Sequence, residues 1–403
     1  MFPETLPAEI SACLEQHILR CWFPRAVDPK GGFFQSYDDA WKPGADQERS
    51  VVYQARLTWT AAEAALREKT KTVLWRERAA HGVAYLSKSL WDEARGGFYW
   101  SVDTETKKST RDEKHVYGNA FAVYALATVY KATKDRAALE LAKRGFAWLE
   151  QHAHDEKHLG WFEALELDGT PKPIGTANDQ IGTKLGLKSM NTHIHLLEAL
   201  TALYGVWPDS LVKTRLAEVH VLVRDKIAQP EGYQRLFFQP DWTPAPDHLS
   251  FGHDVETGFL LHESAHALKL RDEKTAKTAR ALVDHALAHG WDAQYGGFFD
   301  AADRETKKIE HREKVWWVEA EGLNALLLMH KLYGKETPRY GEAFLKLWAF
   351  IRDKQCDSQN SGWFSATDDD GTPQRSKAKS DAWTDPYHQA RSLWHVLDGL
   401  TAL

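Results

Sequence analysis

Clusters of histidine, acidic, arginine and aromatic residues recur along the chain just where apolar helical segments are expected to begin. Imidazoles titrate near neutral pH, so such clusters can take up and release protons during a reaction. In chain order they are SVVYQARLTW from Ser50, KHVYGNAFAVY from Lys114, KSMNTHIHLLEAL from Lys188, SFGHDVETGFLL from Ser250, EKVWWVEAEGL from Glu313 and DAWTDPYHQARSLW from Asp381.

Helical spacing selects the side chains that can share one face. Asn191 and His195 are four residues apart and His253 and Glu256 are three apart, so each pair can point the same way. His193 and His195 are about 200° apart, and we expect His195 to face inward. If the helices run parallel around a ring, the clusters form the rim of one pocket: Arg56, Tyr117, Asn191, His195, His253, Glu256, Trp316, Trp317, Glu321, Trp383, Tyr387 and His388.

Each cluster also has a purely structural interpretation. A polar residue at the start of a helix commonly bonds to backbone groups, and we expect Asp254 and Asp385 to be helix caps. Trp316 and Trp317 could belong to the core. The matching register of all the clusters favours the pocket.

Several kinds of chemistry lack their usual motifs. The sequences HIH and GHDVE do not supply the ligand spacing of a zinc site, so we expect no bound metal. No GxGxxG or GxxxxGK[ST] motif follows a strand, and no GxSxG elbow is present. Nucleotide binding and covalent acyl transfer are therefore not predicted.

Two enzyme classes fit a pocket of imidazoles, carboxylates and aromatic rings. Glycoside hydrolysis would need a carboxylate pair, for which Glu256, Glu319 and Glu321 are candidates. Proton transfer next to a sugar carbonyl would need bases that titrate near neutrality. The rim histidines favour the second class, and Arg56 could stabilise the enediolate that forms.

Internal repeats define the architecture that must position these residues. A glycine, an aromatic run and a polar turn recur about every 65 residues, as in GGFFQSYDDAWKP from Gly31 and GGFYWSVDTETKK from Gly96. Each such run predicts a short strand or hairpin. The period leaves room for two helices in each repeat.

Helical periodicity fills the space between these hairpins. Segments such as 55–66 and 120–129 are apolar on much of their circumference and predict buried inner helices, whereas 136–152 and 274–289 carry the charges of outer helices. Two helices in each of six repeats predict an all-α fold, an (α/α)6 barrel of about twelve helices with short β-hairpins between the repeats. Residues 1–403 are expected to form a single domain.

Composition narrows the range of partners. The 403 residues carry a formal net charge of -6 with interspersed signs, and no basic stripe for nucleic acid or an anionic membrane is evident. Three cysteines and the lack of a leader or a long apolar run predict a cytoplasmic protein. The 17 tryptophans suit a sugar ligand, because indole rings stack on sugar faces. A monomer and a homodimer are both compatible with the sequence.

The motifs QARLTW, HVYGNAFAVYAL, KSMNTHIHLLEA, FGHDVE, WWVEAE and WTDPYHQAR occur in order between residues 54 and 391. In their order and their spacing on a sixfold repeat, they resemble the N-acylglucosamine 2-epimerase superfamily, and within it the cellobiose 2-epimerases. The resemblance implies an (α/α)6 barrel and inversion of C2 of a reducing-end sugar through a cis-enediolate, without a cofactor.

The resemblance also implies roles for individual residues. His253 of GHDVE and His388 of PYHQAR correspond to the acid/base pair, and His195 of NTHIH would assist in ring opening or hold sugar oxygens. Arg56 would stabilise the enediolate. The remaining residues would contact the sugar, by hydrogen bonds from Tyr117, Asn191 and Glu256, and by stacking of Trp317 and Trp383, with Trp316 the neighbour in WW.

Some positions depart from the family pattern. Val318 and Glu319 replace the proline and glutamine of WWPQAE, and Thr384 and Asp385 replace the lysine and glycine of WKGPYH. The segment 175–187 also lacks the acidic pattern of cellobiose epimerases. A free hexose such as mannose or glucose is therefore an alternative to a β-1,4-linked disaccharide. An aldose-ketose isomerase, a glycoside hydrolase and a non-catalytic sugar-binding protein are the alternative functions.

Overall fold

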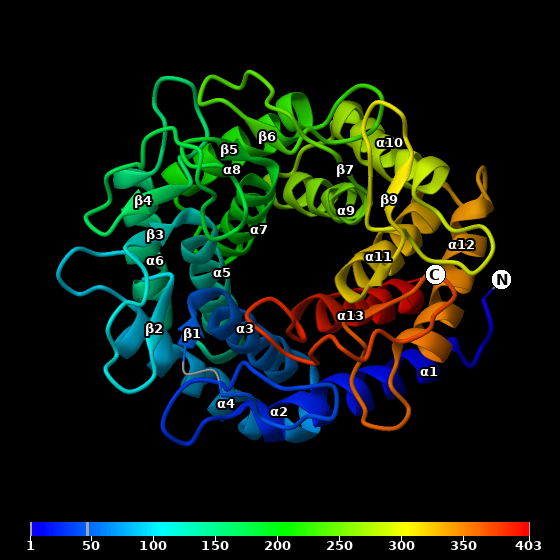
Figure 1. Cartoon of the computed structure of the whole chain (residues 1–403), viewed down its shortest axis with the longest axis horizontal. Coiled ribbons are helices and arrows are strands. Elements are labelled where there is room, and N and C mark those ends of the chain that lie inside the picture. Colours follow the sequence, from blue (N-terminus) through cyan, green and yellow to red (C-terminus); the bar gives the residue numbers. More distant parts are fainter. Residues whose placement is uncertain (1, 46–47, 403) are drawn as a thin grey trace.

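The computed structural model describes residues 2–45 and 48–402 and forms two concentric rings of helices (Figure 1). Neighbouring inner helices pack against each other in chain order, and the last packs on the first, which closes the ring. The predicted all-α fold, an (α/α)6 barrel, is confirmed. The inner helices are α3 (Val51–Arg67), α5 (Val116–Thr133), α7 (Met190–Val206), α9 (Phe251–Leu268), α11 (Trp316–Tyr333) and α13 (Tyr387–Thr401).

The outer ring is amphipathic and covers the inner one. Helix α6 has the bounds expected from its periodicity, and α1 packs on α13, so the two ends of the chain meet (Figure 1). Helix α2 and the π-helical turns η1, η3, η4 and η5 extend this ring. Its elements are α1 (Leu6–Cys13), η1 (Leu14–Leu19), α2 (Arg20–Ala26), α4 (Thr72–Tyr85), η3 (Leu86–Leu90), α6 (Arg136–His152), α8 (Ser210–Leu222), η4 (Val223–Ile227), α10 (Glu273–His289), α12 (Arg339–Phe350) and η5 (Ile351–Gln355).

Short antiparallel ladders join each repeat to the next at one end of the barrel. The strand that precedes an inner helix pairs with a strand from the following repeat. Among the described strands, 301–302 and 309–311 also pair with each other, as a hairpin of the kind expected from the sequence. The hairpins contribute mainly isolated bridges, such as Trp91 to Phe98. The ladders are β1 (Glu48–Ser50) with β2 (Ser101–Asp103), β3 (Glu113–His115) with β4 (Ala164–Glu166), β5 (Lys188–Ser189) with β6 (Phe237–Phe238), β7 (Leu249–Ser250) with β8 (Ala301–Ala302) and β9 (Ile309–His311), and β10 (Lys314–Val315) with β11 (Ala366–Thr367).

A buried polar side chain ties each of five inner helices to the hairpin of its own repeat. These side chains accept the backbone N–H of the residue that follows the turn, at 2.7–3.1 Å. An N–H buried without such a partner would be costly, so the bond holds the helix in a defined rotation. We call these acceptors the anchor residues: Gln54, Asn119, His193, Asp254 and Glu319.

Buried ion pairs hold the start of an inner helix in a similar way. Lys114 pairs with Asp92, Lys188 with Asp155, Lys314 with Asp292 and Lys379 with Asp357, at 2.8–3.1 Å. The fourth repeat has Leu249 and Gln229 at the corresponding positions. Both charges are replaced together there, so neither is left buried without its partner. No described helix is both long and apolar enough to span a membrane.

Candidate active site

The anchor residues determine which side chains face the barrel axis. A residue two positions after an anchor lies about 200° around the helix, so it points away from the hairpin and toward the axis. The inner helices run parallel, so these side chains converge at one end of the barrel, which we call the mouth. They are Arg56, Phe121, His195, Glu256 and Glu321, and Arg391 of α13 joins them.

His253 and His388 both pack against one tryptophan, Trp317. Their ring centroids are 4.7 and 5.7 Å from the Trp317 ring. Burial and the nearby His195 lower the pKa of His253 to about 3. Burial and the nearby Arg56 hold the pKa of His388 well below its ordinary value. Two imidazoles from distant repeats, both with lowered pKa values, therefore share one part of the mouth.

The hydrogen-bond partners of the two histidines differ. Nδ1 of His388 lies 2.7 Å from Oε1 of Glu321 and 3.9 Å from Glu256. Nδ1 of His253 lies 2.6 Å from the Ser250 hydroxyl. A carboxylate stabilises the protonated form of an imidazole, whereas a hydroxyl does so less well. His388 is therefore the better placed of the two to hold a proton.

Arg391 connects the carboxylates beneath these histidines. One terminal nitrogen, Nη2, lies 2.8 Å from Oε1 of both Glu256 and Glu321, and Nη1 bonds to Glu198. All four side chains are buried. Burial raises the pKa values of Glu256 and Glu321 to about 7, although Arg391 opposes the shift.

This arrangement bears on two kinds of site considered from the sequence. Ligand atoms of Glu256, Glu321 and His388 lie within 4.8 Å of one another, as a metal site would require, but the Arg391 guanidinium already supplies the cation between the carboxylates. Glycosidases hold their two carboxylates about 5–9.5 Å apart, on either side of the bond to be cleaved. Glu256 and Glu321 instead share one arginine nitrogen.

Arg56 occupies the adjacent part of the mouth. Its guanidinium donates to Asp385 at 3.1 Å and to the Tyr117 hydroxyl at 2.9 Å. It also lies over the Phe121 ring, 4.4 Å from the centroid. The Asp385 carboxylate accepts the N–H of Tyr387, the first residue of α13, and also orients Arg56, although Pro386 and not Asp385 occupies the N-cap position. Inner-helix N-termini add partial positive charge, and this end of the barrel favours an anion.

His195 and His193 point in different directions, as their spacing predicted. Nδ1 of His195 lies 3.1 Å from Glu198, and its ring packs against Tyr117 and Phe121. His193 is the anchor that accepts the N–H of Trp161. Glu198, held by His195 and Arg391, has its pKa lowered to about 2, although burial opposes the shift.

Three other candidates differ in their surroundings. Asn191 lies one turn before His195, and its buried Oδ1 has no hydrogen-bond partner among the described residues. Trp383 is 38% exposed and lies near Trp100 and Tyr117, so its ring is accessible to a ligand. Trp316 has no ring contact with the histidines in the described part of the chain, and Trp317 is the better candidate for stacking.

The structure corrects two expectations about acidic residues. Asp254 does not cap α9; it is an anchor that accepts from the backbone N–H and the side chain of Gln234. Glu319 accepts the N–H of Phe298 and points away from the mouth, so it cannot be a catalytic carboxylate or a determinant of ligand specificity. The equivalent anchors of the first two repeats, Gln54 and Asn119, are uncharged.

The role of Glu319 leads to a prediction about stability. Burial raises its pKa to about 8, above the ordinary value of 4.5. The unfolded chain therefore loses this proton first, and the stability of the protein falls as pH rises from about 4.5 to about 8. Glu319→Gln lacks this loss. The free energy of unfolding in urea of Glu319→Gln, relative to that of wild type, should be higher at pH 8 than at pH 5. An equal difference between variant and wild type at both pH values would contradict the role assigned to Glu319.

The divergent segment 175–187 contacts the mouth indirectly. Asp179 lies 3.0 Å from Nε2 of His115, whose Nδ1 accepts the N–H of Tyr117 at 3.1 Å. Because Nδ1 accepts a hydrogen bond, Nε2 carries the hydrogen and donates a hydrogen bond to Asp179. The segment therefore helps to hold the first turn of α5, which bears Tyr117.

Sequence reasoning missed Glu198 and Phe121 and did not foresee the bridging role of Arg391. A glutamate inside the apolar run LLEAL of α7 was the available signal, since a buried charge requires a partner. The two-residue offset from the anchors was a second signal, because it selects Phe121 and Glu321 as it selects His195.

Comparisons with known proteins find relatives over almost the whole chain. The family model described as N-acylglucosamine 2-epimerase (GlcNAc 2-epimerase) matches residues 32–392. A cellobiose 2-epimerase of Bacteroides fragilis is 30% identical, with 98% of this chain and 99% of that protein covered. A D-mannose isomerase of Marinomonas mediterranea is 26% identical, with 96% and 97% covered.

A solved structure extends the similarity to three dimensions. The cellobiose 2-epimerase from Spirochaeta thermophila superposes with a TM-score of 0.88 at 32% identity, with 99% of this chain and 97% of that chain covered. The similarity thus spans both rings of helices.

Proposed function

The chain belongs to the N-acylglucosamine 2-epimerase family and is an enzyme of the sugar epimerase and isomerase group, and we propose that it inverts C2 of a reducing-end aldose. The substrate is a cellobiose-type or mannobiose-type disaccharide or a free glucose or mannose. The observation that carries this proposal is that two imidazoles, His253 and His388, pack against the same ring, that of Trp317.

The two histidines act on opposite faces of C2. After the ring opens, one imidazole takes the C2 proton, the C–H electron pair forms the C1–C2 double bond, and the carbonyl pair moves to O1. The other imidazole returns a proton to C2 from the opposite face. No net oxidation occurs. His388, backed by Glu321 at 2.7 Å, is the histidine that carries the proton between turnovers.

The enediolate oxygen is stabilised by Arg56. Its guanidinium is already oriented by Asp385 and Tyr117, so little reorganisation is needed when the charge develops. The N-termini of the inner helices act in the same direction. His195, held by Glu198, assists ring opening or holds a sugar oxygen.

Hydroxyl groups and sugar rings meet the remaining side chains. The sugar hydroxyls form hydrogen bonds with Tyr117, Glu256 and Asn191, whose Oδ1 has no other partner among the described residues. Trp317 stacks on the reacting sugar. The accessible Trp383 ring stacks on a second sugar when the substrate is a disaccharide.

Turnover in deuterated water tests the proposal. Both epimers should acquire deuterium at C2, detected by NMR, when the enzyme is supplied with glucose, mannose, cellobiose, mannobiose and N-acetylglucosamine in turn. The proposal would be refuted if none of these sugars acquired deuterium at C2.

A second candidate is an aldose-ketose isomerase, which the similarity to the Marinomonas mediterranea D-mannose isomerase favours. The same enediolate then receives its proton at C1. Chromatography of the products from mannose distinguishes the two: glucose supports the epimerase, and fructose as the main product supports the isomerase.

A further inference from the structure

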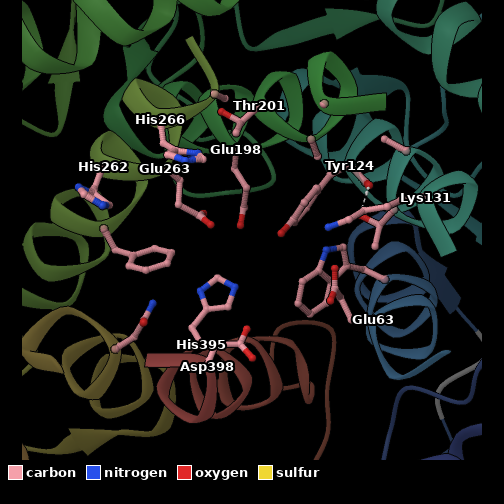
Figure 2. A pocket seen from close by; sticks show the side chains of 18 of the residues that line it. Glu63, Tyr124, Lys131, Glu198, Thr201, His262, Glu263, His266, His395 and Asp398 are labelled. Carbon is pink, nitrogen blue, oxygen red and sulfur yellow. Dashed lines mark hydrogen bonds between the residues drawn. The ribbon is translucent and has the colours of Figure 1, made fainter. Parts of the chain in front are cut away.

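A second cavity opens at the end of the barrel opposite the mouth. Its volume is about 940 Å³, within the range of small-molecule sites, roughly 300–1,000 Å³. The C-terminal halves of the inner helices line it, and side chains from several of them point into it (Figure 2). Of the described residues placed in the active site above, only Glu198, which holds His195 and Arg391, also lines this space.

Two residues that line this cavity carry polar atoms without partners among the described residues. The buried Nδ2 of Asn324 and the buried Nδ1 of His395 have no hydrogen-bond partner among the described residues. Asn324 is 3% exposed. Figure 2 shows the Glu263 carboxylate and the His395 ring directed into the central space. No hydrogen bond or ion pair joins Glu263 to another residue in the part of the chain that the structure describes. These groups offer both donors and acceptors to a ligand.

Most of the charges in the interior of the cavity are already neutralised. Arg67 pairs with Glu63 and Asp398, and Glu198 pairs with Arg391. Burial raises the pKa of Glu263 to about 7 and lowers that of His395 to about 3, so His395 is uncharged and Glu263 partly so. Three exposed lysines at the rim are the cations that remain: Lys131, Lys134 and Lys331.

Aromatic rings supply flat apolar walls. Trp59, Tyr124 and Phe259 line the cavity, and His395 packs on Phe259 with centroids 4.8 Å apart. Flat rings beside unpartnered donors and acceptors match a molecule that has apolar faces and hydroxyl edges.

We propose that this cavity is a second binding site, for an uncharged saccharide. Each sugar hydroxyl both donates and accepts, so one ligand can satisfy Asn324, His395 and Glu263 together while its ring packs on Trp59 or Phe259. The Glu198 carboxylate lines the cavity and also holds His195, Tyr387 and Arg391, so the two sites share a wall. The proposal rests on the lining of the cavity and not on the activity of the mouth.

Titration calorimetry with methyl β-cellobioside tests the proposal, because this sugar cannot open to an aldehyde and is not turned over. Wild type should show one binding event that Glu263→Leu and Asn324→Leu each weaken by about tenfold or more. Glu140→Leu, a matched change on the outer face of α6, should leave it intact. Binding of the same sugar at the mouth would persist in all these variants. A failure of the proposed function at the mouth can therefore be told apart from a failure of this proposal.

Two outcomes would overturn the proposal. One is binding that is absent from wild type or equal in wild type, Glu263→Leu and Asn324→Leu. The other is an affinity for glucose 6-phosphate, or for glucosamine, that is at least about tenfold higher than the affinity for glucose and that is lost in Glu263→Leu. The site would then select a charged ligand.

Discussion

Replacing His388 with asparagine should lower the rate of deuterium exchange at C2 by about 10²–10⁴-fold, the usual contribution of a general acid or base. Asparagine can still bond to Glu321 but cannot take up a proton. His253→Asn should cause a loss of the same order, because each imidazole serves one face of C2. NMR of sugar incubated in deuterated water measures the exchange.

His193→Asn is the matched control for these two variants. His193 is an anchor that accepts the N–H of Trp161, and Asn119 does the same for Phe98 in the second repeat. Asparagine at 193 should therefore retain exchange at the wild-type rate. If both His388→Asn and His253→Asn kept exchange within about tenfold of wild type, the acid/base assignment would be wrong.

Replacing Arg391 with methionine should lower the free energy of unfolding by about 3–5 kcal/mol, as expected when one partner of a buried ion pair is removed. Glu198, Glu256 and Glu321 would lose their shared cation in a fully buried position. Denaturation in urea measures the loss. Arg67→Met, which removes partly exposed pairs with Glu63 and Asp398, should cost only about 0–1 kcal/mol.

The loss in Arg391→Met should depend on pH. Without the arginine the folded-state pKa values of Glu256 and Glu321 rise further above the ordinary value, and that of Glu198 rises from about 2, so the unfolded chain loses the protons of Glu256 and Glu321 first as pH rises. The free energy of unfolding of the variant therefore falls furthest below that of wild type above about pH 7, where wild-type Glu256 and Glu321 ionise beside Arg391. The difference from wild type should be larger at pH 8 than at pH 5. A loss below about 1 kcal/mol at both would contradict the role of Arg391.

The anchors explain why some sequence-based expectations succeeded and others failed. His193 and His195 lie about 200° apart on one helix, so only one of them could face inward, and His195 was expected to do so. The same offset separates Glu319 from Glu321, and the sequence analysis placed Glu321 at the rim while it kept both as candidate carboxylates for glycoside hydrolysis. The choice depends on which of them meets the N–H of Phe298, a contact across 21 positions of the chain.

The positions of His253 and His388 could be predicted because they depend on repetition. Each inner helix begins a similar distance after its hairpin, so equivalent positions meet at one end once the ring closes. Partners of those histidines are less regular: Glu321 for one and Ser250 for the other. Such asymmetry arises from single side chains that the repeat does not specify.

The amino-acid sequence by itself determined the repeat, the two helices of each unit and the end of the barrel at which the polar residues gather, because these follow from local periodicity. Only the tertiary structure decided that Arg391 joins three glutamates, that Glu319 faces its hairpin, and that a second cavity lies at the far end of the inner helices. Periodicity gives the angle between two residues on one helix. The rotation of that helix relative to its neighbours is set by contacts between segments far apart in the chain.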